Sequence, residues 1–197
     1  MNYLAHAYLS FDHEEILVGN LVSDFVKGNA KFNFPENIQK GITLHRAIDT
    51  FTDTHPATQM AKTIFRSHYR LYSGAFVDVV YDHFLANDPN EFTEQTLRNF
   101  SERVYVILDR HVEYLPERFL RIFSYMKSQN WLFNYQSRLG TEASFRGLAR
   151  RAKYISEGET AGLLLEKNYE VLHGYYSAFF PDVKSFAYKM CEDILKL

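Results

Sequence analysis

Cysteine is almost absent from this 197-residue chain, whose only thiol is that of Cys191. One thiol cannot form an internal disulfide, and it excludes a zinc site built from several cysteines. Such cysteine usage is typical of proteins that work in a reducing compartment, so we predict a cytoplasmic location.

Long apolar runs are also missing. No stretch is long and apolar enough to span a bilayer, and Met1–Ser10 has no basic residue ahead of an apolar segment. We therefore predict no membrane association. The chain also lacks a glycine-rich phosphate loop and a Gly-x-Ser-x-Gly elbow, which excludes the nucleotide-binding and serine-hydrolase chemistries that depend on them.

Proline and glycine are scarce, with five and nine residues, and no alternation of apolar and polar residues persists. Apolar residues recur at spacings of three and four, which predicts an all-α protein. Hydrophobic residues make up 46% of the chain, so we expect one helical bundle, a single domain over residues 1–197. The expected helices cover residues 2–9, 12–26, 35–51, 56–72, 74–87, 91–112, 116–129, 136–155, 159–180 and 181–195, with a loop over 27–35.

Basic residues are missing between Arg70 and Arg98, where the most apolar of these helices lies. Asp78 and Asp82 are four residues apart on it, and His83 follows directly. Two buried carboxylates on one face cost several kcal/mol unless a positive charge compensates them. That charge must come from a distant part of the chain or from a bound cation, and a divalent metal is the simplest source.

A second candidate site lies in the helix expected over residues 35–51. His45 and Asp49 are four residues apart and so share a helix face, with Arg46 beside them. This group could hold a metal or a phosphate. A surface helix that carries unrelated charges is the alternative.

Two further candidates lie in the first quarter of the chain. His6 falls on an apolar helix, where a hydrogen-bonded core histidine is the alternative to a ligand. Asp24 has no basic partner nearby in the sequence, although it could equally cap the loop that follows.

Charge is unevenly distributed, although the formal net charge is only −2. Residues 98–153 contain 11 basic and five acidic residues, and Arg146 and Arg150 are spaced to share a helix face. This basic region could meet an acidic partner or could be a solvated surface. A pI near 6.4 and the absence of a recognised motif argue against nucleic acid binding.

Four segments in this order resemble the acyl carrier protein phosphodiesterase family: residues 1–6, 19–28, 41–56 and 78–86. That family is similar to the HD-type metal-dependent phosphohydrolases, which are all-α. The resemblance implies hydrolysis of the phosphodiester that joins 4′-phosphopantetheine to a serine of holo acyl carrier protein. It also implies a divalent metal, manganese in preference to magnesium. The carrier protein is typically small and acidic, so docking is expected on the basic region.

The chain departs from the HD pattern because it contains no His-Asp dipeptide. It has His45-Arg46 and, in reversed order, Asp82-His83. The expected metal ligands are one imidazole and three carboxylates, a set that suits manganese or magnesium: Asp24, His45, Asp78 and Asp82.

The remaining polar candidates are given catalytic or supporting roles. Arg46 is expected to hold a phosphate oxygen, because a planar guanidinium suits bidentate contact. Asp49, His6 and His83 are candidates for general acid or base, or for support of the ligands.

Three functional hypotheses follow. The first is a metal-dependent phosphodiesterase that acts on the prosthetic group of a carrier protein. The second keeps the metal but gives it a nucleotide or another small phosphoester. The third is a non-catalytic helical binding module, in which distant cations pair with the carboxylates. The oligomeric state is not predicted.

Overall fold

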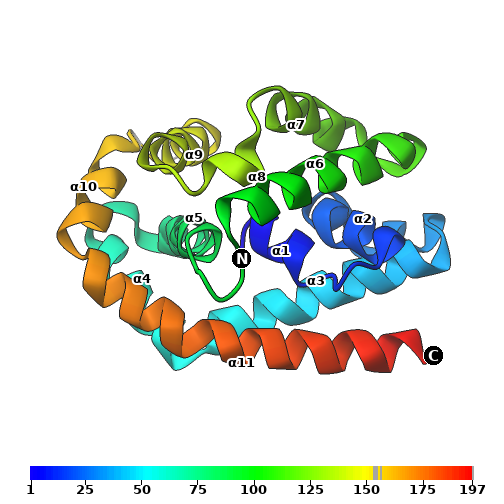
Figure 1. Ribbon diagram of the computed structural model, residues 1–197, viewed down its shortest axis with the longest axis horizontal. Helices are drawn as coiled ribbons and strands as arrows, with labels where there is room; N and C mark the ends of the chain where they lie inside the picture. The colour runs from blue at the N-terminus through cyan, green and yellow to red at the C-terminus, as the bar shows by residue number, and fades with distance from the viewer. Residues whose placement is uncertain (153–154, 156, 197) are drawn as a thin grey trace.

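The computed structural model describes residues 1–152, 155 and 157–196, and within them it contains helices and no strand. The prediction of an all-α fold is confirmed. Figure 1 shows α5 beside α4, α9 and α1 in one half of the molecule, with α11 running along one side. The α-helices are α1 (Tyr3–Tyr8), α2 (Glu14–Val22), α3 (Glu36–Thr54), α4 (Pro56–Tyr69), α5 (Ser73–Ala86), α6 (Glu94–Arg110), α7 (Glu117–Ser128), α8 (Trp131–Asn134), α9 (Arg138–Arg151), α10 (Glu159–Lys167) and α11 (Tyr169–Leu195).

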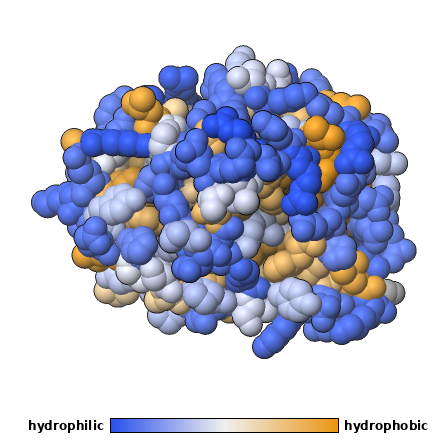
Figure 2. Space-filling view, viewed as in Figure 1, coloured by the Kyte–Doolittle hydropathy of each residue, from blue (hydrophilic) through white to orange (hydrophobic). Residues whose placement is uncertain are grey.

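Among the described residues, four short 3₁₀ helices join these elements: η1 (Ser23–Phe25), η2 (Gly28–Asn33), η3 (Arg70–Tyr72) and η4 (Val112–Tyr114). Hydrophilic residues cover most of the face seen in Figure 2, with separate hydrophobic patches between them. None of the helices in the described part of the chain is long and apolar enough to cross a lipid bilayer.

Helices α2 and α3 touch backbone to backbone, and this contact sets the geometry of the site described below. A Cβ atom added to Gly19 would lie 2.1 Å from the carbonyl oxygen of Ile38, and one added to Gly41 would lie 2.2 Å from that of Ile16. Only glycine allows this approach, because any side chain would overlap the facing backbone. The contact places Asn20, next to Gly19, against the α3 turn that carries His45.

Helix α5 is the buried centre of the bundle, as its apolar sequence predicts. Phe76, Val80 and Tyr81 have no exposed surface. Phe76 stacks on Tyr69 of α4 with ring centroids 3.8 Å apart, and Tyr81 stacks on Phe179 of α11 at 4.8 Å. Aromatic rings therefore fill much of the space between α4, α5 and α11.

The predicted break at Pro181 is wrong, because α11 runs through this residue from Tyr169 to Leu195. Proline removes one backbone donor from the helix. Burial of Phe179, Phe180 and Val183 on either side holds the helix together at this point. The break occurs earlier, between Lys167 at the end of α10 and Tyr169.

Other differences are local. The expected loop over 27–35 contains the 3₁₀ helix η2. Asp12 does not cap α2, which begins after His13; Asp12 has a positive φ of 64° and pairs with Arg103 instead. The helix expected over 136–155 ends at Arg151, and residues 153 and 154 lie outside the described part. The short helix α8 was not predicted, because four residues are too few to show a period.

The glycine contact leads to a stability prediction. We expect Gly41→Ala to lower the free energy of unfolding by about 3 kcal/mol, because the added methyl forces two helix backbones apart. Gly174→Ala is the matched control in α11, where a Cβ meets nothing within 4 Å, and it should stabilise by about 0.5–1 kcal/mol. Urea unfolding of both variants measures the difference. Equal effects would mean that the α2–α3 contact is not tight.

Candidate metal centre

Helix α1 carries one of the candidate histidines and is positioned by a distant carboxylate. No side chain of its own caps its first turn. The fully buried Asp82 of α5 fills that role, because its two oxygens accept hydrogen bonds from the backbone N–H groups of Leu4 (2.8 Å) and Ala5 (3.1 Å). Burial raises the pKa of Asp82 to about 7, although these two hydrogen bonds favour the carboxylate.

Asp78, one turn earlier on α5, is paired with the amino group of Met1. The nitrogen lies 3.1 Å from Asp78 and 3.4 Å from Asp49. Burial opposes the charge of this ammonium, but the two carboxylates outweigh that effect and raise its pKa to about 10. Burial likewise raises the pKa of Asp78, against the attraction of the ammonium. The Met1 ammonium thus supplies Asp78 with a positive charge from a distant part of the chain, one of the two sources that the sequence left open. Asp82 accepts backbone N–H groups and forms no ion pair within the described residues.

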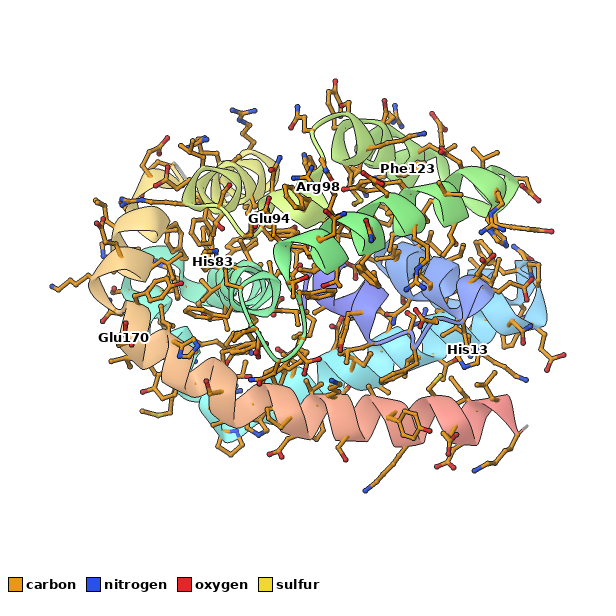
Figure 3. All side chains as sticks on the ribbon, viewed as in Figure 1. His13, His83, Glu94, Arg98, Phe123 and Glu170 are labelled. Atoms are coloured by element: carbon orange, nitrogen blue, oxygen red, sulfur yellow. The ribbon has the colours of Figure 1, made fainter. Side chains whose placement is uncertain are left out.

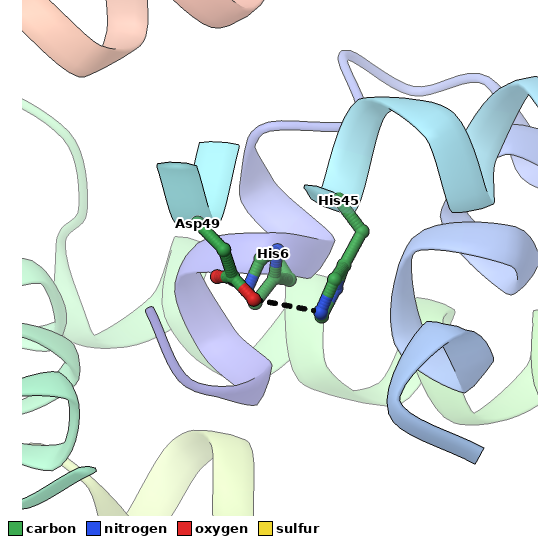
Figure 4. A group of neighbouring side chains, drawn as sticks. All are labelled: His6, His45 and Asp49. Carbon is green, nitrogen blue, oxygen red and sulfur yellow. Dashed lines mark hydrogen bonds and ion pairs between the residues drawn. The ribbon is translucent and has the colours of Figure 1, made fainter. Parts of the chain in front are cut away.

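The candidate metal group forms around α3 instead (Figure 4). His6, His45 and Asp49 each direct one ligand atom to a common point, and these atoms lie within 4.8 Å of one another. His45 Nε2 lies 3.0 Å from Asp49 Oδ2, and His6 Nε2 lies 3.2 Å from Asp49 Oδ1. Asp24 adds a second carboxylate, 3.3 Å from His45 Nε2. The structure thus contains a His-His-Asp group that could hold a metal ion.

Both imidazoles are oriented by Asn20, a wholly buried residue of α2. His6 Nδ1 lies 2.8 Å from Asn20 Oδ1, and His45 Nδ1 lies 2.7 Å from the Asn20 carbonyl oxygen. The Asn20 amide nitrogen donates to the His6 carbonyl oxygen, which identifies Oδ1 as the acceptor. Each Nδ1 therefore carries a proton, and each Nε2 faces the carboxylates.

The charge state of the group favours a cation at its centre. Burial, together with the nearby charge of His45, lowers the pKa of His6 to about 4. At neutral pH the lone pair of His6 Nε2 therefore faces a carboxylate oxygen with no proton between them. Burial opposes a charged His45 too, but hydrogen bonds to Asp24 and Asp49 outweigh it and raise the pKa of His45 to about 9. One proton on His45 is thus the only positive charge that these two imidazoles supply.

The two carboxylates remain ionised and open to solvent. Burial disfavours the anion of Asp49, but the hydrogen bond from His45 and the nearby Met1 ammonium hold the pKa of Asp49 well below its usual range. The hydrogen bond from His45 also lowers the pKa of Asp24. The side chains of Asp24 and Asp49 are 71% and 39% exposed, against 6% for that of His45. A ligand therefore reaches the group from the carboxylate side.

The donor set fits a divalent ion. Histidines that bind metals use one ring nitrogen and donate the other N–H to a protein acceptor, as both imidazoles do here. Two imidazoles and one or two carboxylates suit manganese, magnesium, iron or zinc. This group differs from the ligand set expected from the sequence. Asp78 pairs with the Met1 ammonium and Asp82 accepts hydrogen bonds from α1, whereas His6 and Asp49 lie beside His45.

The other predicted residues lie around the group or away from it. Arg46 donates to the carbonyl oxygen of Val26 at 3.0 Å. His83 lies on α5 (Figure 3) and contacts the Tyr135 carbonyl oxygen at 2.8 Å and the Tyr169 hydroxyl at 3.1 Å. It is not part of the His-His-Asp group.

Sequence reasoning missed Asn20 and the amino group of Met1. A buried amide within the otherwise apolar run from Ile16 to Val22 was the available signal for Asn20. The Met1 interaction joins residues 77 positions apart, so no local pattern could have identified it.

Fold and site together define an all-α protein with a candidate metal centre built from histidine and carboxylate side chains. The sequence profile described as acyl carrier protein phosphodiesterase matches residues 1–183. The chain belongs to the acyl carrier protein phosphodiesterase family.

Several bacterial relatives carry that name. The Yersinia pestis protein is 32% identical over 182 residues, which cover 92% of this chain and 94% of the relative. The Photorhabdus laumondii protein is 30% identical and covered to 92% on both sides. The Escherichia coli O6:H1 protein is 32% identical over 186 residues, 92% of this chain and 94% of the relative. No solved structure matches this chain significantly.

The role of Asp82 leads to a prediction about pH. A carboxyl group whose pKa rises on folding contributes stability below its unfolded value of 3.8. That contribution is lost as pH rises through about 7. Asparagine cannot titrate and cannot accept both N–H groups, so Asp82→Asn should be less stable by about 1–3 kcal/mol at pH 5. The deficit should shrink as pH rises toward 8. Urea unfolding across this range checks it, and a constant deficit would contradict the raised pKa.

Proposed function

We propose that this protein is a metal-dependent phosphodiesterase that hydrolyses the 4′-phosphopantetheine group from holo acyl carrier protein and releases the apo protein. Family membership supports the substrate, since the relatives are named acyl carrier protein phosphodiesterase. The observation that carries the mechanism is the pair of imidazoles whose Nε2 atoms converge with Asp49 on one point.

His6, His45 and Asp49 are the proposed protein ligands, with Asp24 as a fourth. Manganese is the proposed ion and magnesium the alternative, because carboxylates favour hard cations while two imidazoles favour a transition metal. A divalent ion supplies this site with polarisation of a phosphoryl oxygen and acidification of a water molecule.

The chain's own residues supply orientation and charge. Asn20 fixes both imidazoles through Nδ1, so the two rings cannot turn away when substrate arrives. Arg46, adjacent to His45, is the proposed contact for a non-bridging phosphate oxygen. To make this contact, its guanidinium must give up the hydrogen bond that it donates to the Val26 carbonyl oxygen. Asp24 is the most exposed member of the group, so solvent and substrate reach the group beside this carboxylate.

Asp78, Asp82 and His83 have structural roles in this proposal. Asp82 and Asp78 hold the N-terminal segment that carries His6, and His83 joins α5 to Tyr135 and Tyr169. A single domain over residues 1–197, a cytoplasmic location and the absence of nucleic acid and membrane partners stay predictions.

A set of variants tests the ligand assignment. We expect His45→Asn and Asp49→Asn to lower bound manganese and to reduce turnover of holo acyl carrier protein by at least about 1000-fold, since removal of a ligand removes the ion. Asp82→Asn removes no ligand and acts only through the position of α1, so it should lose less metal than Asp49→Asn. His68→Asn, at an exposed histidine of α4, is the control. Metal analysis and the intact mass of the carrier protein provide the readouts. Metal loss in Asp82→Asn with retention in Asp49→Asn would contradict the assignment.

The protonation of His45 leads to a second prediction. Because the pKa of His45 is about 9, metal must displace its proton at neutral pH. The dissociation constant for manganese should therefore fall about tenfold for each pH unit between 6 and 8. Calorimetric titration in two buffers with different ionisation heats should show about one proton released per ion at pH 7. An affinity that does not change with pH would mean that the ion binds elsewhere.

A further inference from the structure

A cavity of about 640 Å³ lies between α3, α4 and the start of α5, and three basic residues line it: Lys62, Arg66 and Arg70. We call these three residues the α4 basic row. Lys62 and Arg66 lie one turn apart on α4, and Arg70 directly follows Tyr69, the last residue of that helix. The row therefore extends about 10 Å along α4.

Two of the three positive charges in the row, those of Arg66 and Arg70, have no ion-pair partner within the described residues. Residues 54–77 contain these three basic residues and neither aspartate nor glutamate. Lys62 pairs with Asp53 at 2.6 Å. Arg66 and Arg70 are exposed, and within the described residues neither guanidinium forms an ion pair or a hydrogen bond. Two unpaired guanidinium groups on one cavity favour an anionic ligand.

The cavity adjoins the candidate metal centre. Asp53, which lines it, follows Asp49 by one turn of α3, about 6 Å along the axis. Asp78, which also lines it, shares the Met1 ammonium with Asp49. A partner bound on the α4 basic row would therefore lie next to a phosphate held at the metal centre.

The backbone at Arg70 is strained. Its φ of 48° lies in the left-handed region, which favours glycine and is unfavourable for other residues. The next residue, Leu71, lines the same cavity and is 99% exposed. A strained arginine beside a fully exposed leucine is typical of a contact surface rather than of a segment selected for stability.

The length of the row selects the kind of ligand. A single phosphate could contact two of the three basic residues but not a row of about 10 Å. Several carboxylates on the surface of a folded acidic protein match both the length and the charge. The exposed Leu71 adds an apolar contact that a free phosphate could not use.

We propose that the α4 basic row, together with Leu71, is the docking surface for acidic side chains of the carrier protein that lie close to its phosphopantetheine-bearing serine. The proposal rests on the proposed function. It differs from the sequence-based expectation, which put docking on residues 98–153. Arg146 and Arg150 of that region line a separate groove with Tyr3 and Trp131, and Arg146 lies 3.9 Å from Glu142.

The test compares two matched double charge reversals in the manganese-loaded protein: Arg66→Glu with Arg70→Glu, and Arg146→Glu with Arg150→Glu. Binding of fluorescently labelled apo carrier protein is measured by anisotropy at 50 and 300 mM salt, because the apo form cannot be turned over. We expect the first pair to weaken binding at least about tenfold at 50 mM salt and to reduce the salt dependence. The second pair should change binding less than about twofold.

Hydrolysis of bis(4-nitrophenyl) phosphate is the control for the metal centre, and it should be unchanged in both double variants. Arg70→Gly separates docking from folding. It should raise the melting temperature by relieving strain and should still weaken binding. Unchanged binding in the Arg66 and Arg70 variant, or a larger loss in the Arg146 and Arg150 variant, would overturn the docking proposal.

The proposed function fails separately. Wild-type protein that binds the carrier protein in a manner sensitive to Arg66 and Arg70, but releases no phosphopantetheine from the holo form, would retain the docking surface and overturn the activity. If wild-type protein releases phosphopantetheine but the Arg66 and Arg70 variant binds the carrier protein as tightly as the wild type, the activity is retained and the docking surface is overturned.

Discussion

The two hydrogen bonds from the Nδ1 atoms of His6 and His45 to Asn20 are the constraint on which the site depends. They fix each ring so that Nε2 faces Asp49. Asn20 lies close enough to α3 to form them because the adjacent Gly19 packs directly on Gly41. At neutral pH one of these rings is uncharged, and its lone pair faces a carboxylate oxygen. A cation at this point would resolve that contact, which supports the proposal that the group binds a metal ion.

The placement of α1 is the second requirement, because this six-residue helix carries His6 and has no cap of its own. Asp82 binds its first-turn amides, and Asp78 binds the ammonium of Met1. Two carboxylates that resemble metal ligands in the sequence thus hold in place the segment that supplies a ligand. The same ammonium contacts Asp49, so the anchoring of the N-terminal segment and the charge of the metal group are linked.

The fold class was predictable because helical periodicity is a local property, whereas the partners of individual side chains were not. His45 and Asp49 share a face through the pitch of one helix, so their proximity followed from spacing alone. His6 comes from a separate helix, and its approach to Asp49 depends on Asp82, 76 residues further along the chain. The scarcity of cations around Asp78 and Asp82 correctly indicated that their charge needed compensation. The absence of lysine and arginine could not distinguish a bound ion from the Met1 ammonium, because either source of charge is compatible with it. The proposed docking surface differs from the expectation for residues 98–153 because a count of charges along the sequence does not show which basic residues line the cavity beside the site.

Anomalous diffraction from crystals soaked in manganese tests the central claim most directly. The account predicts one strong peak about 2–2.5 Å from Nε2 of His6, from Nε2 of His45 and from a carboxylate oxygen of Asp49. A peak bound by Asp78 and Asp82 in place of the Met1 ammonium, or no peak at millimolar manganese, would contradict it.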